Sequence, residues 1–137
     1  MHSDSHRIFI GSSVHRWNDN RILYKEAVSL SKKYNVELHA PAEFNKKHLK
    51  GVDIYGLPAW DKEKDRKRIR AELWQRLKRS KTSIFHFHDP ELIWIGIKAK
   101  LLLKKKVIYD IHRCYIADCY IIDIVFNSFG LLVFSKR

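Results

Sequence analysis

The chain has 137 residues, of which 45% are hydrophobic, and it contains only five glycines and three prolines. This length is typical of one domain with a substantial core, and the composition argues against a long disordered or low-complexity region. Lys and Arg outnumber Asp and Glu by 27 to 15, so the formal net charge is +12. Such a charge attracts nucleic acid, anionic lipid or phosphorylated substrates without choosing among them.

The N-terminal stretch MHSDSHR has no apolar segment, so no secretory signal is expected. Cys114 and Cys119 form no metal-binding pattern. A reduced cytoplasmic chain is the simplest interpretation, with one surface disulfide as the alternative. We therefore expect a cytoplasmic protein.

Short apolar segments alternate with amphipathic segments along the chain. In the first helix, Ile22, Leu23, Ala27 and Leu30 recur at helical spacing. Strands are predicted at 7–13, 35–40, 51–57, 83–88 and 106–112, and helices from Asn18 or Asp19 to about Lys33, at 62–80 and at 90–104.

This alternation predicts an α/β fold, a Rossmann-like open, mostly parallel twisted sheet with helices on both faces. The strand at 51–57 follows a loop and not a helix, so its place in the sheet is less determined. In the common strand order 3-2-1-4-5, the order reverses between the first and fourth strands, and ligands bind at that point. The tail after His112 fits neither a regular strand nor an amphipathic helix.

Histidines fall at or just after the carboxyl ends of four predicted strands. They are His15, His39, His88 and His112. The expected strand order would bring His15 and His88 to one crevice, with His112 one strand further along the sheet.

The stretch HDPE, residues 88–91, has two interpretations. Asp89 suits the N-cap of a helix, Pro90 its first position, and Glu91 the positive end of its dipole. His88 remains a functional candidate because it ends a strand, and the carboxylate of Glu91 could also face the crevice.

His86 and His88 are two residues apart and point to the same face of a strand. Such a pair can bind zinc only if a third ligand converges on it, and no compelling third ligand is evident in the sequence. We therefore expect no metal site. Dinucleotide-binding, Walker and nucleophile-elbow motifs are also absent, so no bound cofactor is expected.

The predicted helix 62–80 is strongly basic. Positions 61–81 hold ten Lys or Arg residues and four acidic residues, a net charge of +6. A solvated helix face explains such a pattern, and adhesion to an anionic membrane surface is the functional alternative. Specific nucleic-acid binding is not expected, because there is no recognised fold signature and no aromatic residue on the basic face.

Several motifs together resemble the N-terminal domain of bacterial family 4 glycosyltransferases, over about residues 7–112. They are SSVHRWNDNRILYKEAVSLSKKYNVELHA, GVDIYGLP, LWQRL and FHFHDPELIWIGIKAKLLLKKKVIYDIH. The combination of H-x-H-D-P-E-L with K-V-I-Y-D-I-H is the most specific part of the resemblance.

The resemblance implies a GT-B fold, in which this domain binds a glycan or lipid-linked acceptor and a second domain binds a nucleotide-sugar donor. It implies retaining sugar transfer, usually without a metal, for cell-surface polysaccharide synthesis at the inner face of the membrane. The matching substrate-binding positions are His15, Asp19, Arg21, His88, Glu91 and His112, with Asp89 and Asp110 in the same motifs and with His88 and Glu91 as catalytic candidates.

The family pattern continues with an acidic residue after the last histidine, where this chain has Arg113 and then Cys114. The expected organisation is a Rossmann-like domain at 1–112 and a divergent apolar tail at 113–137, with the donor domain absent by truncation. Such a chain should be inactive alone. The alternative is a non-catalytic interaction module that dimerises, or pairs with a separate donor-domain chain, through its tail.

Overall fold

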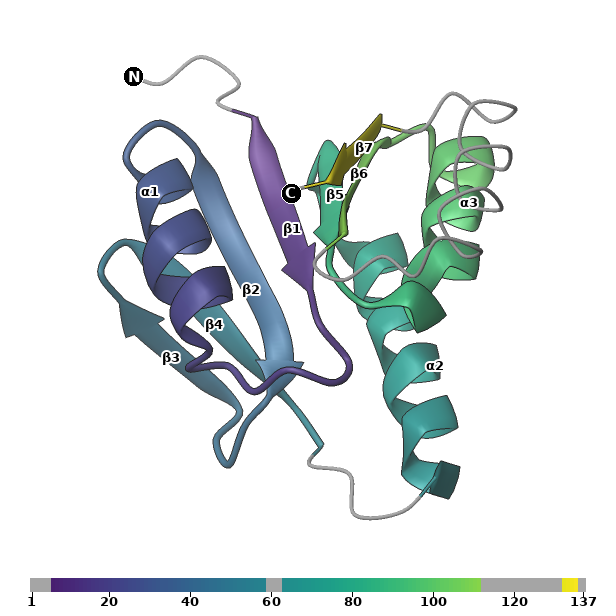
Figure 1. Ribbon diagram of the computed structural model, residues 1–137, viewed down its shortest axis with the longest axis horizontal. Coiled ribbons are helices and arrows are strands. Elements are labelled where there is room, and N and C mark those ends of the chain that lie inside the picture. The colour runs from purple at the N-terminus through teal and green to yellow at the C-terminus, as the bar shows by residue number, and fades with distance from the viewer. Residues whose placement is uncertain (1–5, 59–62, 112–131, 136–137) are drawn as a thin grey trace.

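The computed structural model describes residues 6–58, 63–111 and 132–135. These residues form one seven-stranded sheet in the order β3-β4-β2-β1-β5-β6-β7 (Figure 1). Every neighbouring pair is parallel except β3 and β4. The strands are β1 (Arg7–Gly11), β2 (Asn35–Pro41), β3 (Lys46–Leu49), β4 (Val52–Leu57), β5 (Ile84–Phe87), β6 (Lys106–Ile111) and β7 (Leu132–Ser135).

The five predicted strands are confirmed, and their observed order, β4-β2-β1-β5-β6, is the expected 3-2-1-4-5. The chain places β2 and β4 on one side of β1 and then crosses to β5 on the other side. The carboxyl ends of β1 and β5 therefore flank the reversal point, where side chains from both halves of the sheet can meet.

Strand β3 was not predicted, because the sequence there indicated a loop. Its residues are largely exposed, so the hydrophobic alternation that marks a half-buried strand is missing. Lys50 and Gly51 join β3 to β4 with φ values of 49° and 84°. Two successive positive φ values are the geometry of a tight hairpin turn, which accounts for the antiparallel pairing with β4.

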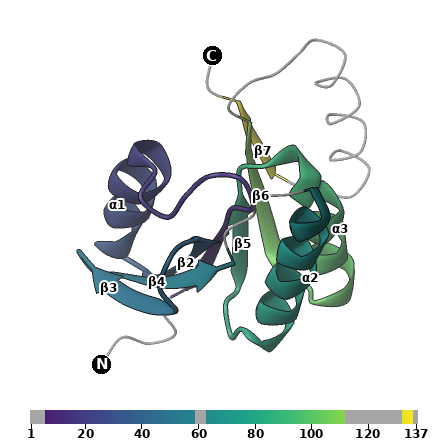
Figure 2. The same cartoon turned by 90° about the horizontal axis from the view of Figure 1, so that it is seen from below.

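Helices cover both faces of the sheet, as predicted (Figure 2). One face is covered by a single continuous helix that comprises η1 (Asn20–Ala27), a wider π-helical segment, and α1 (Val28–Ser31). The other face is covered by α2 (Glu63–Arg79) and by α3 (Ile93–Leu102), which follows a short 3₁₀ turn, η2 (Pro90–Leu92). The carboxylate of Asp19 caps η1 by accepting hydrogen bonds from the backbone N–H groups of Arg21 and Ile22.

The alternation within β5 decides where its histidines point. Phe85 and Phe87 are fully buried against α2 and α3, whereas Ile84 packs into the core beneath η1 and α1. His86 and His88 follow Ile84 at spacings of two, so they share its face. Asp110 lies on the same face of β6, between Tyr109 and Ile111 of the opposite core.

Strand β7 lies in the tail, where the sequence fits neither a regular strand nor an amphipathic helix; residues 132–135 pair in parallel with β6 and extend the same sheet. His112 and residues 113–131 lie outside the described residues.

Within the part of the chain that the structure describes, no helix has both the length and the apolar character needed to cross a membrane.

Candidate functional site

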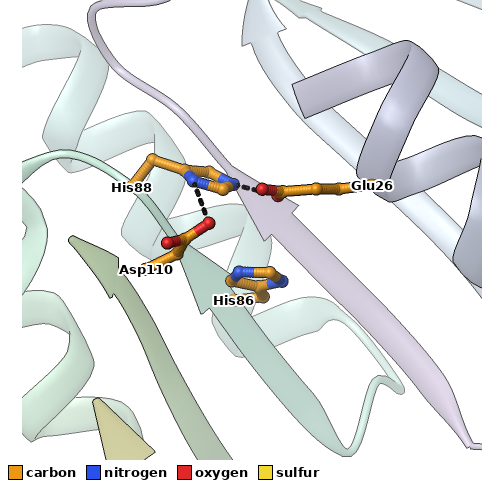
Figure 3. A group of neighbouring side chains, drawn as sticks. All are labelled: Glu26, His86, His88 and Asp110. Atoms are coloured by element: carbon orange, nitrogen blue, oxygen red, sulfur yellow. Dashed lines mark ion pairs between the residues drawn. The ribbon is translucent and has the colours of Figure 1, made fainter. Parts of the chain in front are cut away.

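Polar side chains gather at the carboxyl edge of the sheet, around the reversal point between β1 and β5. Four of them converge from three elements: Glu26 from η1, His86 and His88 from β5 and the residue after it, and Asp110 from β6 (Figure 3). We refer to these four residues as the histidine–carboxylate cluster. Figure 3 shows Glu26 reaching from its helix toward His88, with Asp110 on the other side of the same ring.

His88 is at the centre of this cluster. Its Nε2 lies 3.1 Å from Oε2 of Glu26, and its Nδ1 lies 3.5 Å from Oδ2 of Asp110. The ring of His86 is tilted against that of His88, with 4.8 Å between the ring centroids. The side chain of His88 is fully buried, and those of Asp110 and Glu26 are 6% and 12% exposed.

Burial shifts the pKa values of two members of the cluster, His88 and Asp110. Removal from water lowers the pKa of His88 to about 4, against the opposing attraction of Asp110, so the ring is neutral at pH 7. Burial, followed by the contact with Glu26, raises the pKa of Asp110. Both shifts favour the uncharged forms of His88 and Asp110.

A second group of contacts is centred on Asp89. Its carboxylate accepts hydrogen bonds from Ser12 Oγ at 2.8 Å and from the backbone N–H of Ser13 at 2.8 Å, and it lies 2.9 Å from Nδ1 of His15. The same contact raises the pKa of His15, and these interactions lower the pKa of Asp89 although its burial opposes them. Asp89 thus holds the loop after β1 in place.

This arrangement corrects the expected role of Asp89. It precedes the turn at Pro90–Leu92, but its side chain makes no capping hydrogen bond there. The Asp89 carboxylate instead accepts hydrogen bonds from Ser12 and Ser13 in the loop after β1. Pro90 does occupy the start of the helical turn, as predicted.

Glu91 faces α2. Its carboxylate pairs with Arg70 at 2.9 Å and with Arg66 at 3.1 Å, and it accepts a hydrogen bond from the hydroxyl of Ser13. Two guanidinium groups fix the position of this carboxylate. Glu91 therefore joins α2 to the loop after β1, next to the cluster but outside it.

The remaining predicted residues divide between this edge and other places. Arg21 lies at the cluster, with a guanidinium nitrogen 3.5 Å from Nδ1 of His88. Asp19 serves as the helix cap. His39 is on the opposite face, stacked between Phe9 and Tyr55 at 4.0 and 4.7 Å, and it does not join the edge.

His15 and His88 reach the same edge, as expected, and His15 contacts Asp89, the residue that follows His88. The side chain of His15 is 33% exposed, whereas that of His88 is buried. Of these two histidines, His15 is therefore the one that a solute can reach from outside.

Sequence reasoning missed Glu26 as a site residue. The signal was present: Glu26 lies four residues after Ile22 and three after Leu23, so it occupies the inward face of an amphipathic helix. An acidic residue on such a face needs a partner. Its convergence with His88 depends on how the helix crosses the sheet, which the sequence does not specify.

A scan against protein-family models gives no match for this chain, and a search of curated proteins finds no similar sequence. The resemblance to family 4 glycosyltransferases therefore stays a prediction based on motifs. What the chain is shown to be is an α/β protein with a mostly parallel sheet.

Proposed function

We propose that this chain is the acceptor-side domain of a retaining glycosyltransferase of the GT-B type. The observation that carries the proposal is the concentration of polar side chains at the reversal point between β1 and β5. In open α/β sheets this is the place where ligands bind. The motifs that resemble the glycosyltransferase family supply the side chains found there.

His15 and Arg21 are the side chains best suited to hold a sugar hydroxyl. His15 is partly exposed and its orientation is fixed by Asp89 at 2.9 Å. Arg21 lies near it on the first turn of η1, a helix whose N-terminus is capped by Asp19. Rigidly held donors and acceptors of this kind orient a hydroxyl for reaction.

The two catalytic candidates, His88 and Glu91, have different surroundings. His88 is neutral at pH 7, but its ring is buried behind the exposed edge. Its role in the proposal is to position neighbouring groups. Glu91 is held by ion pairs with Arg66 and Arg70, and its carboxylate serves to fix the loop after β1.

An acceptor linked to lipid would place the domain at an anionic membrane. Arg66, Arg70 and Arg76 of the basic helix are used in internal ion pairs. Among the α2 side chains that the structure describes, those of Lys67, Arg68, Lys78 and Arg79 are basic and face solvent. The neighbouring α3 exposes Trp94, Leu101 and Leu102, with exposed fractions of 73%, 55% and 68%. Basic and large apolar side chains on adjacent helices suit adsorption to an anionic interface.

The alternative function is an interaction module, and one observation favours it. Strand β7 comes from the tail and stands at the end of the sheet order. The outer edge of a terminal strand can pair with a strand of another chain, either a second copy or a separate donor domain. Sedimentation velocity tests the homodimer, since a monomer at high concentration would contradict it.

The direct test of the acceptor-side assignment is incubation of the purified 137-residue chain with UDP-glucose or GDP-mannose and a panel of sugar acceptors. We expect neither transfer nor hydrolysis, because transfer requires the donor to be positioned as well as the acceptor. Robust turnover by the isolated chain would overturn the proposal.

A further inference from the structure

We propose that the histidine–carboxylate cluster binds a first-row transition-metal dication, and that Zn²⁺ fits it best. Glu26, His86, His88 and Asp110 each offer one ligand atom, and these atoms all lie within 4.8 Å of one another. They come from η1, from the end of β5 and from β6, so the cluster joins three elements that are distant in sequence.

The donor set determines the class of ion. Two imidazoles and two carboxylates suit Zn²⁺ and its neighbours, whereas Mg²⁺ and Ca²⁺ prefer oxygen ligands alone. Bonds of about 2.0–2.2 Å place the ligands of a tetrahedral ion roughly 3.4 Å apart. The longest separation between ligand atoms would therefore shorten from at most 4.8 Å by about 1.4 Å on binding, through rotation of the side chains.

Hydrogen bonding within the cluster is incomplete. Oδ1 of Asp110, Nε2 of His88 and both carboxylate oxygens of Glu26 are buried and have no hydrogen-bond partner among the described residues. Oε2 of Glu26 lies 3.1 Å from Nε2 of His88, but the two atoms do not form an aligned hydrogen bond. Buried polar atoms without partners are costly, so their convergence on one point needs a cause.

A dication would supply that cause. It would neutralise two buried carboxylates and provide the coordination that the orphaned atoms lack. Arg21 lies 3.5 Å from Nδ1 of His88, and when both carboxylates are ionised it can offset at most one of their two negative charges.

The number of ligands indicates a structural ion. Four protein ligands complete a tetrahedral site of the structural kind, and the His88 side chain at its centre is fully buried. The ion would fasten η1 to β5 and β6 and hold the reversal point rigid. This inference does not rest on the glycosyltransferase proposal, whose family usually acts without a metal.

The test uses the untagged full chain, stripped with a chelator and titrated with ZnCl₂ by calorimetry, with MgCl₂ and CaCl₂ as comparisons. We expect one Zn²⁺ per chain, no uptake of the other two ions, and visible d–d absorption of tetrahedral type when Co²⁺ replaces Zn²⁺. Zinc at 100 times its Kd should raise the Tm by about 10 °C.

Two near-isosteric variants, Glu26→Gln and His86→Gln, should each weaken Zn²⁺ binding by about 100-fold or more while keeping the wild-type NMR spectrum elsewhere. The matched control is His48→Gln, which removes an exposed histidine paired with Asp53 at 2.8 Å and should leave binding unchanged. The double variant C114S/C119S should also bind as the wild type does.

Several results would overturn the proposal. One is the absence of stoichiometric Zn²⁺ binding, which would mean that the cluster shares protons among its members. Another is binding that survives both cluster variants, or that is lost in the cysteine variant. Because these measurements detect the ion and not sugar transfer, they leave the proposed acceptor function to its own test.

Discussion

Replacing Asp89 by alanine should be among the most destabilising single changes in the loop region. The side chain is 2% exposed and receives hydrogen bonds from Ser12 and Ser13 at 2.8 Å, with His15 at 2.9 Å. Alanine leaves the Ser12 hydroxyl and the Ser13 backbone N–H without this acceptor in a buried position, and it removes the partner of the partly exposed His15. Each such loss costs about 1 kcal/mol or more, so we expect a decrease of about 3–5 kcal/mol in the free energy of unfolding.

Urea denaturation followed by tryptophan fluorescence measures this loss through the transition midpoint at constant m-value. Asp89→Asn, which keeps the size and one acceptor, should fall between alanine and wild type. The control is Glu43→Ala, which removes an ion pair between side chains that are 65% and 67% exposed and should change stability by less than about 0.5 kcal/mol. A loss below about 1 kcal/mol for Asp89→Ala would refute the role assigned to this carboxylate.

Three further predictions concern other parts of the molecule. Burial lowers the pKa of His39, so its neutral form stabilises the fold above pH 6.5, and this contribution is lost as pH falls from 6.5 through the folded pKa. His39→Phe, which keeps a ring between Phe9 and Tyr55, should flatten the pH dependence of the Tm in that range, and an unchanged slope would contradict this. Gly56→Ala should lower stability by about 2 kcal/mol or more in urea denaturation, because its Cβ would lie 1.8 Å from the backbone oxygen of Phe44. Gly11→Ala should cost less, since its Cβ would meet side-chain atoms of Phe85 and Leu73 at 3.1 and 3.2 Å, and an equal cost would argue against the backbone clash. Sedimentation with phosphatidylglycerol vesicles should show at least about 30-fold weaker binding for Lys67→Glu/Arg68→Glu, whereas Lys32→Glu/Lys33→Glu, with the same change in charge, should bind as wild type. Equal losses in the two double variants would indicate attraction by net charge alone.

The parallel core of the fold could be predicted from the sequence, because its strands are short apolar runs separated by helical patterns. RIFIG and VDIYGL are of this kind, and both appear as strands. The strand order followed from the common topology of such sheets. Strand β3 could not be found in this way, since Lys46, Lys47 and His48 at an exposed edge carry no burial pattern.

The candidate site could be predicted only in part. The approach of His15 and His88 to one edge followed from the carboxyl ends of their strands. The role of Asp89 could not, because the local sequence favours a helix cap and the competing donors lie more than 70 residues away in the chain. The convergence of Glu26 and Asp110 on the two histidines likewise depends on tertiary packing.

The central claim is that the edge between β1 and β5 binds the sugar of an acceptor and does not bind the nucleotide of a donor. Its most direct test is an NMR titration of the ¹⁵N-labelled chain with simple mono- and disaccharides, and separately with UDP and GDP. We expect the saccharides to shift the amide signals of residues 12–15, 21 and 88–91, and we expect the nucleotides to leave these signals unchanged. Nucleotide binding at this edge, or saccharide shifts confined to other parts of the chain, would contradict the claim.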